Sequence, residues 1–160
     1  MCGTEHDRLA TVFRSDAPES WVAATNEEQS AGLLGTNGCT LPGSTGVRSF
    51  IRGHVVLPVR DQEIPEFIWS IWVEIAKGDM IRFIEYQQDE RRTELPPYDG
   101  HLDSRLAAYS PPALGLRVAI VNREPGVVPL LLLDRNQDHA LVREQAEGIT
   151  LHRVWELNER

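Results

Sequence analysis

The sequence is poor in cysteine and lacks any long apolar run. It has 160 residues and only two cysteines, Cys2 and Cys39. No stretch approaches the roughly 18 consecutive apolar residues that cross a bilayer, and the first residues lack the basic and then apolar layout of a signal peptide. We therefore expect a cytoplasmic protein with no membrane association. In that reducing compartment the cysteines are expected to be free thiols or metal ligands rather than a disulfide.

The sequence also lacks the short motifs by which common enzymes are recognised. It contains no Gly-x-Ser-x-Gly nucleophile elbow, no phosphate loop ending in Gly-Lys-Ser/Thr, no Gly-x-Gly-x-x-Gly fingerprint and no His-Glu-x-x-His pair. These absences remove the hydrolases, nucleotide-binding enzymes and metalloproteases that carry such motifs. They favour a non-enzymatic protein, and an enzyme of unrecognised type stays open.

Basic residues are scarce relative to acidic ones. Lys and Arg total 16 against 24 Asp and Glu, which gives a formal net charge of −8. Such a chain repels nucleic-acid phosphates unless its basic residues gather on one face. The adjacent Arg91 and Arg92 directly follow two acidic residues and are interpreted as a balanced surface pair. We expect no nucleic-acid partner, whereas the acidity favours a basic protein partner or serves solubility alone.

Length and composition are those of an ordinary globular chain. Hydrophobic residues make up 41% and charged residues 25%, enough apolar material for one core and no signature of disorder. Single cores commonly run to about 100–200 residues. We therefore expect one domain over residues 1–160.

Alternating apolar residues predict strands in two hairpins. The first joins 49–59 to 67–76, and the second joins 114–121 to 127–133. Within 67–76 the odd-numbered residues are expected to face the core. The other face is expected to be only half covered, which would leave Trp72 partly exposed.

Helix signals fall between and after these strands. Helices are predicted after Asp16 with Pro18 in the first turn, over 78–88, over 137–146, and from a cap at Thr150. Together the patterns predict an α+β fold, with an antiparallel sheet of about four to six strands in two hairpins packed with about three or four helices.

Two segments are expected to lack regular structure. The stretch 35–46 is rich in turn-forming residues, with at most a short strand around Cys39, and is interpreted as an exposed connection. The stretch 93–112 contains two Pro-Pro pairs, which predict a rigid loop. Long ordered loops of this kind often carry function.

The predicted loop 93–112 concentrates side chains able to do chemistry. An imidazole beside a carboxylate can move a proton near neutral pH, as His101 and Asp103 could. Structural roles are the alternative: Tyr98 anchors the loop, Asp103 caps or turns the chain, and Arg105 bonds carbonyl groups. We expect ligand or partner binding here and assign no catalytic residue. The candidate binding residues are Trp72, Tyr98, His101, Asp103, Arg105 and, on the helix 137–146, Glu144.

Four separated segments resemble a known bacterial family. They cover residues 49–53, 67–73, 96–106 and 138–150, and they occur in the family's order. On these segments the chain resembles the family called domain of unknown function 2199 over nearly its whole length. That family has no established activity, so the resemblance implies a bacterial protein and no mechanism.

The same resemblance implies a candidate zinc site. Family members often begin with Cys-x-x-Cys-Gly-x-x-His and carry a later cysteine, and this chain has only the second half of that motif. Its candidate metal ligands are Cys2, His6 and Cys39, and thiolate and imidazole suit tetrahedral zinc. The missing first cysteine leaves three readings open: a start assigned too late, a decayed site, or cysteines that pack as small hydrophobes. No other cofactor is expected.

Three functions are therefore carried forward. The first is a small interaction module, in one version an immunity-type protein that neutralises a basic toxin, with 93–112 and Trp72 as its surface. The second is a zinc-binding protein. The third is an enzyme of unrecognised type centred on the 93–112 loop.

Overall fold

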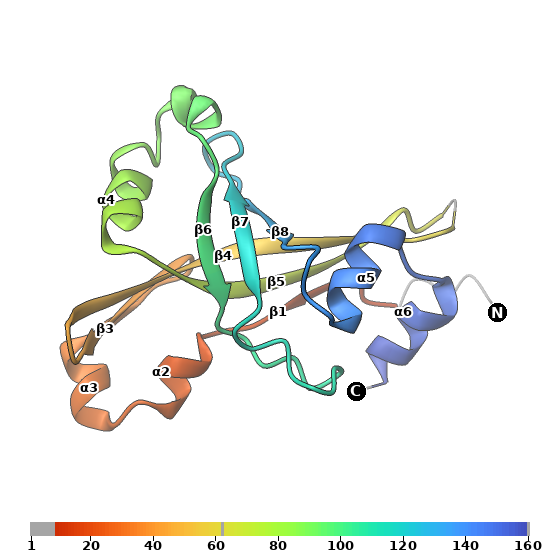
Figure 1. Cartoon of the computed structure of the whole chain (residues 1–160), viewed down its shortest axis with the longest axis horizontal. Coiled ribbons are helices and arrows are strands. Elements are labelled where there is room, and N and C mark those ends of the chain that lie inside the picture. The colour runs from red at the N-terminus through yellow and green to blue at the C-terminus, as the bar shows by residue number, and fades with distance from the viewer. Residues whose placement is uncertain (1–8, 62, 160) are drawn as a thin grey trace.

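The computed structural model describes residues 9–61 and 63–159. Within them the chain forms eight strands, five α-helices and one 3-10 helix (Figure 1). The strands are β1 (Val12–Arg14), β2 (Leu33–Leu34), β3 (Gly38–Gly43), β4 (Gly46–Pro58), β5 (Glu66–Ile75), β6 (Tyr98–Leu102), β7 (Arg117–Val121) and β8 (Leu130–Leu133). The helices are α2 (Glu19–Ala23), α3 (Asn26–Ala31), α4 (Lys77–Glu85), α5 (Ala140–Glu147), α6 (Leu151–Asn158) and the 3-10 helix η1 (Glu90–Glu94).

Five strands close into a barrel. They run in the order β5-β6-β7-β8-β4, and β4 pairs again with β5. The β4–β5 ladder is antiparallel and joins Ser49 with Ile75 at one end and Pro58 with Glu66 at the other. The closing contact is parallel, with His54 of β4 opposite Leu130 of β8. Closure leaves the ring without a free edge.

The predicted antiparallel sheet of two hairpins is therefore wrong. Three further strands extend the ring, with β1 parallel to β5 and with β3 and β2 added beyond β4. Five α-helices replace the expected three or four. Periodicity indicates which face of a strand is buried, but it does not say that one long strand will pair along both of its edges.

Two interior glycines fit the narrow barrel. A Cβ atom at Gly53 would lie 2.6 Å from the side chain of Leu131, and one at Gly100 would lie 2.6 Å from Cγ2 of Val73. Both distances are well inside van der Waals contact, so any side chain here would push neighbouring strands apart. The barrel core that closes around them includes Ile51, Val55, Ile71, Val73, Leu102, Val118, Ile120, Leu131 and Leu133.

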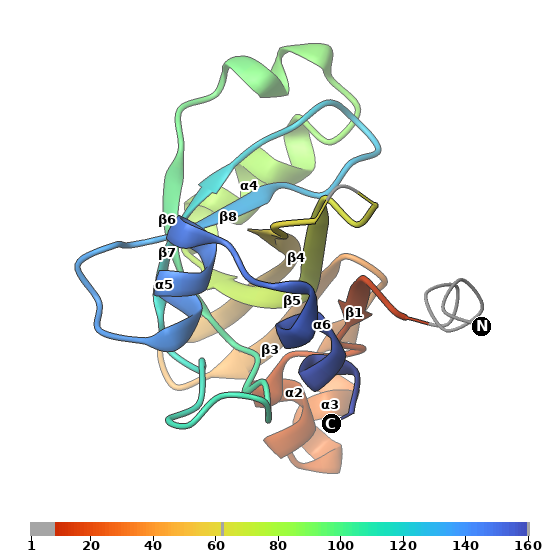
Figure 2. The same cartoon turned by 90° about the vertical axis from the view of Figure 1, so that its right-hand side faces the viewer.

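A smaller core lies outside the barrel. Buried Cys39, Leu41, Phe50 and Trp72 form it, and Trp21 of α2 packs against them. In Figures 1 and 2, α2 and α3 lie by β3, α5 and α6 lie together on another side, and α4 and η1 stand at one end of the barrel. The outer face of the β4–β5 ribbon is thus covered where Trp72 sits.

Both segments expected to be mostly irregular contain strands, and the one in 35–46 falls around Cys39, where at most a short strand was expected. The stretch 35–46 holds β3, and the stretch 93–112 holds β6 and the end of η1. Each proline in these segments lies where no ladder hydrogen bond is lost: Pro42 lies beyond the part of β3 that pairs with β2, and Pro97 precedes β6. Proline content therefore marked the ends of these strands rather than their absence.

The later helices agree with their predicted positions. The threonine at 150 caps α6, because its side chain accepts a hydrogen bond from the backbone N–H of Arg153. Helix α5 is capped by His139, whose Nδ1 accepts from Leu141. Across residues 9–61 and 63–159, no helix is long and apolar enough to cross a bilayer.

Candidate functional site

Trp72 is fully buried, contrary to the prediction that it is partly exposed. It packs with Cys39 and Phe50 in the smaller core, and its Nε1 donates to the backbone oxygen of Ser15 at 3.0 Å. The segments that cover it, β1 to β3 and α2, come from far away in sequence. The alternation within β5 could not reveal that cover, which leaves Trp72 with no exposed surface.

Asp103 and Arg105 attach their loop to α2. The carboxylate of Asp103 accepts from the backbone N–H and the hydroxyl of Ser20, at 2.9 and 3.1 Å. Helix α2 has no side-chain cap of its own, since Pro18 precedes it, so Asp103 supplies one from elsewhere in the chain. Arg105 lies on the surface with its Nε 3.5 Å from Oε1 of Glu19. These contacts are structural.

Tyr98 and His101 both lie on β6 but differ in exposure. Burial raises the pKa of Tyr98, and its hydroxyl has no hydrogen-bond partner among the described residues. His101 is exposed on the outer face, opposite Glu74 of β5 and Arg117 of β7. Within the described chain it makes no hydrogen bond to Asp103, so the carboxylate–imidazole pair considered from the sequence does not form.

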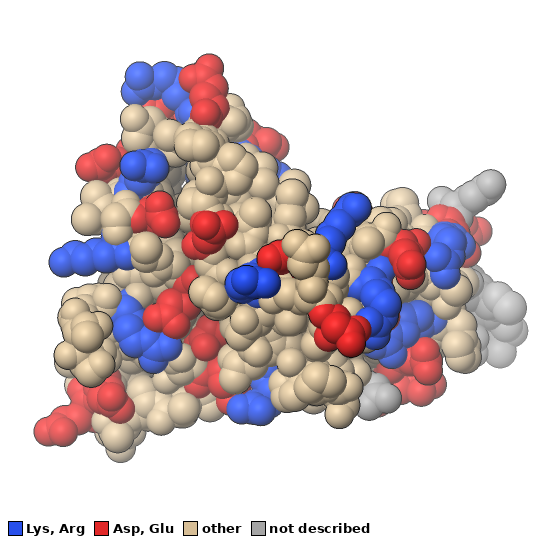
Figure 3. All heavy atoms as spheres, in the orientation of Figure 1, with Lys and Arg blue, Asp and Glu red and all other residues tan. Residues whose placement is uncertain are grey.

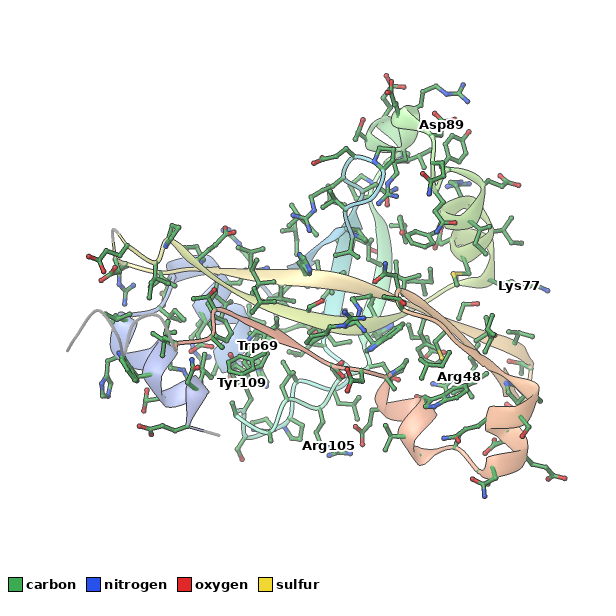
Figure 4. The ribbon with its side chains drawn as sticks, turned by 180° about the vertical axis from the view of Figure 1, so that it is seen from behind. Arg48, Trp69, Lys77, Asp89, Arg105 and Tyr109 are labelled. Carbon is green, nitrogen blue, oxygen red and sulfur yellow. The ribbon has the colours of Figure 1, made fainter. Side chains whose placement is uncertain are left out.

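Glu144 belongs to a buried hydrogen-bonded network. Its Oε1 accepts from the hydroxyl of Tyr109 at 2.5 Å, and its Oε2 accepts from Nε of Arg153 at 2.8 Å. The Tyr109 hydroxyl in turn accepts from Nε1 of Trp69 at 3.1 Å, and Figure 4 shows these two rings side by side. The network joins α5 and α6 to the barrel.

Cys39 is a buried thiol. It is 1% exposed in the smaller core, where burial, with a contribution from Asp103, raises the pKa of its thiol to about 11. The other candidate zinc ligands, Cys2 and His6, lie outside the described residues. Within the described ranges, no three His, Cys, Asp or Glu side chains are grouped so that they could hold a metal ion. The zinc site stays a prediction.

Two hollows on the outside of the barrel share Leu132. One, of about 480 Å³, lies between β8, the β4–β5 ribbon and α5, and Glu66, Arg123 and Arg135 are among its lining residues. The other, of about 580 Å³, lies on the outer face of β6, β7 and β8 and is lined in part by Asp99 and His101. Leu132 points outward from β8 with 46% of its surface exposed. The two hollows with Leu132 are called the Leu132 surface below.

The charges around the Leu132 surface are only partly neutralised. Arg117 pairs with Asp134 at 3.2 Å. By contrast, Asp99, Glu66, Arg123 and Arg135 line the hollows but form no salt bridge with any other described residue. The unpaired groups are therefore two exposed carboxylates, the exposed guanidinium of Arg135 and the partly buried guanidinium of Arg123.

Sequence reasoning missed Leu132 as an exposed residue. It lies in the apolar run 127–133, which is predicted as the second strand of the second hairpin. In such a run no polar residue marks the outer face, so alternation gives no signal. Only the closure of the barrel shows that Leu131 and Leu133 point inward while Leu132 points outward.

Comparisons with known proteins identify a family and no function. No curated protein and no solved structure matches this chain. The sequence model of the family described as "Uncharacterized protein conserved in bacteria (DUF2199)" matches residues 1–149. This match confirms the resemblance found in the separated segments. Because it covers most of the 160 residues, the chain belongs to this uncharacterised bacterial family.

Proposed function

We propose that this protein is a non-enzymatic interaction module that binds a basic protein partner through the Leu132 surface. The observation that carries the proposal is the placement of Leu132, an aliphatic side chain that is 46% exposed at the border of two hollows. The buried centre of a protein interface is more apolar than the surrounding rim, and an exposed leucine beside two hollows suits that position. Neighbouring apolar residues, including Val56, Ile68 and Leu130, line the hollow beside α5.

Charge supports a basic partner. This support rests on the net charge of the whole chain, which is −8, because the unpaired groups of the Leu132 surface have both signs: Asp99 and Glu66 are acidic, and Arg123 and Arg135 are basic. Acidic and basic side chains are interleaved over the face drawn in Figure 3. We therefore expect Leu132 to hold the partner and the overall charge to speed association. An immunity-type protein bound to a basic toxin is one version of this proposal.

The proposed surface uses part of the segment 93–112. Asp99 and His101 of β6 line the hollow on the outer face of β6 to β8, so β6 contributes as a strand and not as a loop. Trp72, the other residue expected at the surface, is buried, so the proposal assigns the central apolar contact to Leu132.

The test compares two substitutions of exposed leucines. Leu132→Asp places a charge at the proposed anchor, and Leu33→Asp is the matched control because Leu33 is 70% exposed on β2 and lines neither hollow. Immobilised wild-type protein and both variants are incubated with bacterial lysate. The proposal expects a protein of net positive charge that wild type and Leu33→Asp retain and that Leu132→Asp binds at least about tenfold more weakly.

The salt dependence of capture and the self-association of the purified chain test the identity of the partner. Release of the captured protein by moderate salt supports electrostatic attraction to an acidic surface. Equal capture by all three proteins overturns the proposal, as does an acidic partner. Sedimentation of the purified chain provides a further check: association that Leu132→Asp abolishes would make a second copy the occupant and would also overturn the basic partner.

A further inference from the structure

The most deeply buried arginines lack carboxylate partners. Six arginines form salt bridges, and the side chains of these six are 21% to 71% exposed. Arg52 and Arg92, only 3% and 5% exposed, form none with the described residues, and neither does the partly buried Arg123. Buried charges are normally paired. Here the more exposed arginines form the salt bridges, and the most buried ones form none with the described residues.

Within the described residues, the side chain of Arg92 donates hydrogen bonds only to backbone carbonyl groups, and its guanidinium lies over the ring of Phe83, 5.9 Å from the centroid. Its Nη1 donates to the oxygen of Gln87 at 3.1 Å and its Nη2 to the oxygen of Val127 at 2.7 Å. Its Nε is buried and has no partner in the described part of the chain. A guanidinium has five N–H donors, so donors and a full positive charge remain to be satisfied.

A hollow of about 190 Å³ opens beside this guanidinium. It lies between η1, the end of α4 and the connection from β7 to β8, which run side by side at the top of Figures 1 and 2. Its polar side chains are Arg92 and the amides of Asn37, Gln87 and Gln88. Unlike the two hollows beside Leu132, it is lined by no Asp or Glu. At roughly 30 Å³ per water molecule, it has room for a small ion with some of its hydration.

A second guanidinium, that of Arg123, also binds the connection from β7 to β8. The Nε of Arg123 donates to the oxygen of Val128 at 2.8 Å, while Arg92 donates to the adjacent carbonyl of Val127. Burial lowers the pKa of Arg123, the nearby carboxylates of Glu124 and Glu66 raise it, and the charge of Arg92 lowers it further. Arg92 and Arg123 thus hold adjacent carbonyl groups of one loop, and of the two only Arg92 lines the hollow.

We propose that this hollow binds a small oxyanion, a phosphate or carboxylate group, with Arg92 as its counter-charge and the side-chain amides of Asn37, Gln87 and Gln88 as further donors. Charge-assisted hydrogen bonds from guanidinium and amide groups are the usual means of holding such anions. A bound anion neutralises the buried charge of Arg92. The site is separate from the Leu132 surface and does not depend on the proposed function.

The experiment follows the Nε–H resonance of Arg92 by NMR. Phosphate, sulfate and acetate are titrated separately at constant ionic strength, with chloride as the reference salt. A saturable shift with an oxyanion and none with chloride is expected. Saturation by phosphate and sulfate alone assigns a phosphoryl group, and saturation by acetate alone assigns a carboxylate. Absence of saturation with every oxyanion overturns the proposal.

A substitution tests the site without removing Arg92, whose loss would also release η1 from the loop. Gln88→Glu brings a carboxylate to the hollow from an exposed position, so it should neutralise Arg92 internally and weaken oxyanion binding at least about tenfold. Ser30→Glu, at an exposed position on α3, adds the same charge elsewhere and should leave binding unchanged. Undiminished binding in Gln88→Glu overturns the assignment. Leu132→Asp should bind the oxyanion like wild type.

Discussion

The guanidinium of Arg52 lies over the indole ring of Trp72, with its central carbon 4.7 Å from the ring centroid. Both side chains are buried, Trp72 completely, and they face each other across the β4–β5 ladder. Burial lowers the pKa of Arg52 to about 10, with the charge of Arg14 as a further cause. The ring thus provides a favourable surface for a cation that has no carboxylate partner among the described residues.

Trp72→Ala should act on stability. Removing a fully buried tryptophan leaves a cavity and deprives Arg52 of its aromatic neighbour, so the free energy of unfolding should fall by about 3–5 kcal/mol. Urea denaturation measures the change. Leu132→Ala is the control, because an exposed side chain should change the free energy of unfolding by less than about 0.5 kcal/mol. Similar effects of the two substitutions would contradict the burial of Trp72.

Tyr109→Phe should weaken the attachment of α5 and α6. The substitution leaves Oε1 of Glu144 and Nε1 of Trp69 without their partner, which should cost about 1–3 kcal/mol of unfolding free energy. The hydroxyl of Tyr86 makes no hydrogen bond with any described residue, so Tyr86→Phe should be nearly neutral. Thermal unfolding of both variants measures the difference, and a neutral Tyr109→Phe would mean that the network does not form.

Gly53→Ala should strain the barrel, whereas Gly78→Ala should not. A Cβ atom at Gly53 would meet Leu131 at 2.6 Å, and nothing lies within 4 Å of one at Gly78. The first substitution should cost at least about 1–3 kcal/mol. The second lies in the first turn of α4 and should stabilise by about 0.5–1 kcal/mol. Equal denaturation midpoints would contradict the close approach of β4 and β8.

Stability should fall in mild acid because of His54. Burial, together with the charges of Arg123 and Arg52, lowers the pKa of His54 below its ordinary value of about 6.5. The unfolded chain then binds more protons than the folded chain, so the unfolding free energy decreases as the pH falls from about 6.5 toward the lower folded pKa. Protonation at Nδ1 would also remove the hydrogen bond that Arg123 donates there at 2.9 Å.

Unfolding free energies measured at several pH values between about 5 and 8 test this dependence. His54→Gln should flatten the curve over this interval. His152→Gln, at an exposed position on α6, should leave the slope of wild type. A wild-type slope in His54→Gln would assign the acid sensitivity to another group.

Cys39 should react slowly with thiol reagents in the folded protein. Its exposure of 1% and a thiol pKa of about 11 leave little accessible thiolate near neutral pH. Mass spectrometry after brief alkylation should find Cys39 unmodified until denaturant is added. Elemental analysis of protein purified without chelators tests the zinc prediction in parallel: about one zinc per chain would support Cys2, His6 and Cys39 as ligands, and its absence would leave Cys39 as a packing residue.

Local patterns predicted the elements whose signals are complete within a short segment. The alternation in β4 and β5 and the threonine cap of α6 were all readable before the fold was known. Short strands between turn-forming residues were harder to predict: β3 was expected as at most a short strand around Cys39, and β6 was missed, because pairing partners supply most of the stability of such strands. The resemblance to the family was also readable, because it depends on residue identity and order and not on contacts.

The sequence by itself determined the family, the acidic charge and the positions of the longest strands. Only the tertiary structure decided that β4 pairs on both edges to close a barrel, that Trp72 is covered while Leu132 is exposed, and that Arg92 is buried instead of lying on the surface beside Arg91. The physical reason is common to all three. Periodicity records which side of an element is apolar, whereas exposure and charge pairing depend on which distant segments cover that side.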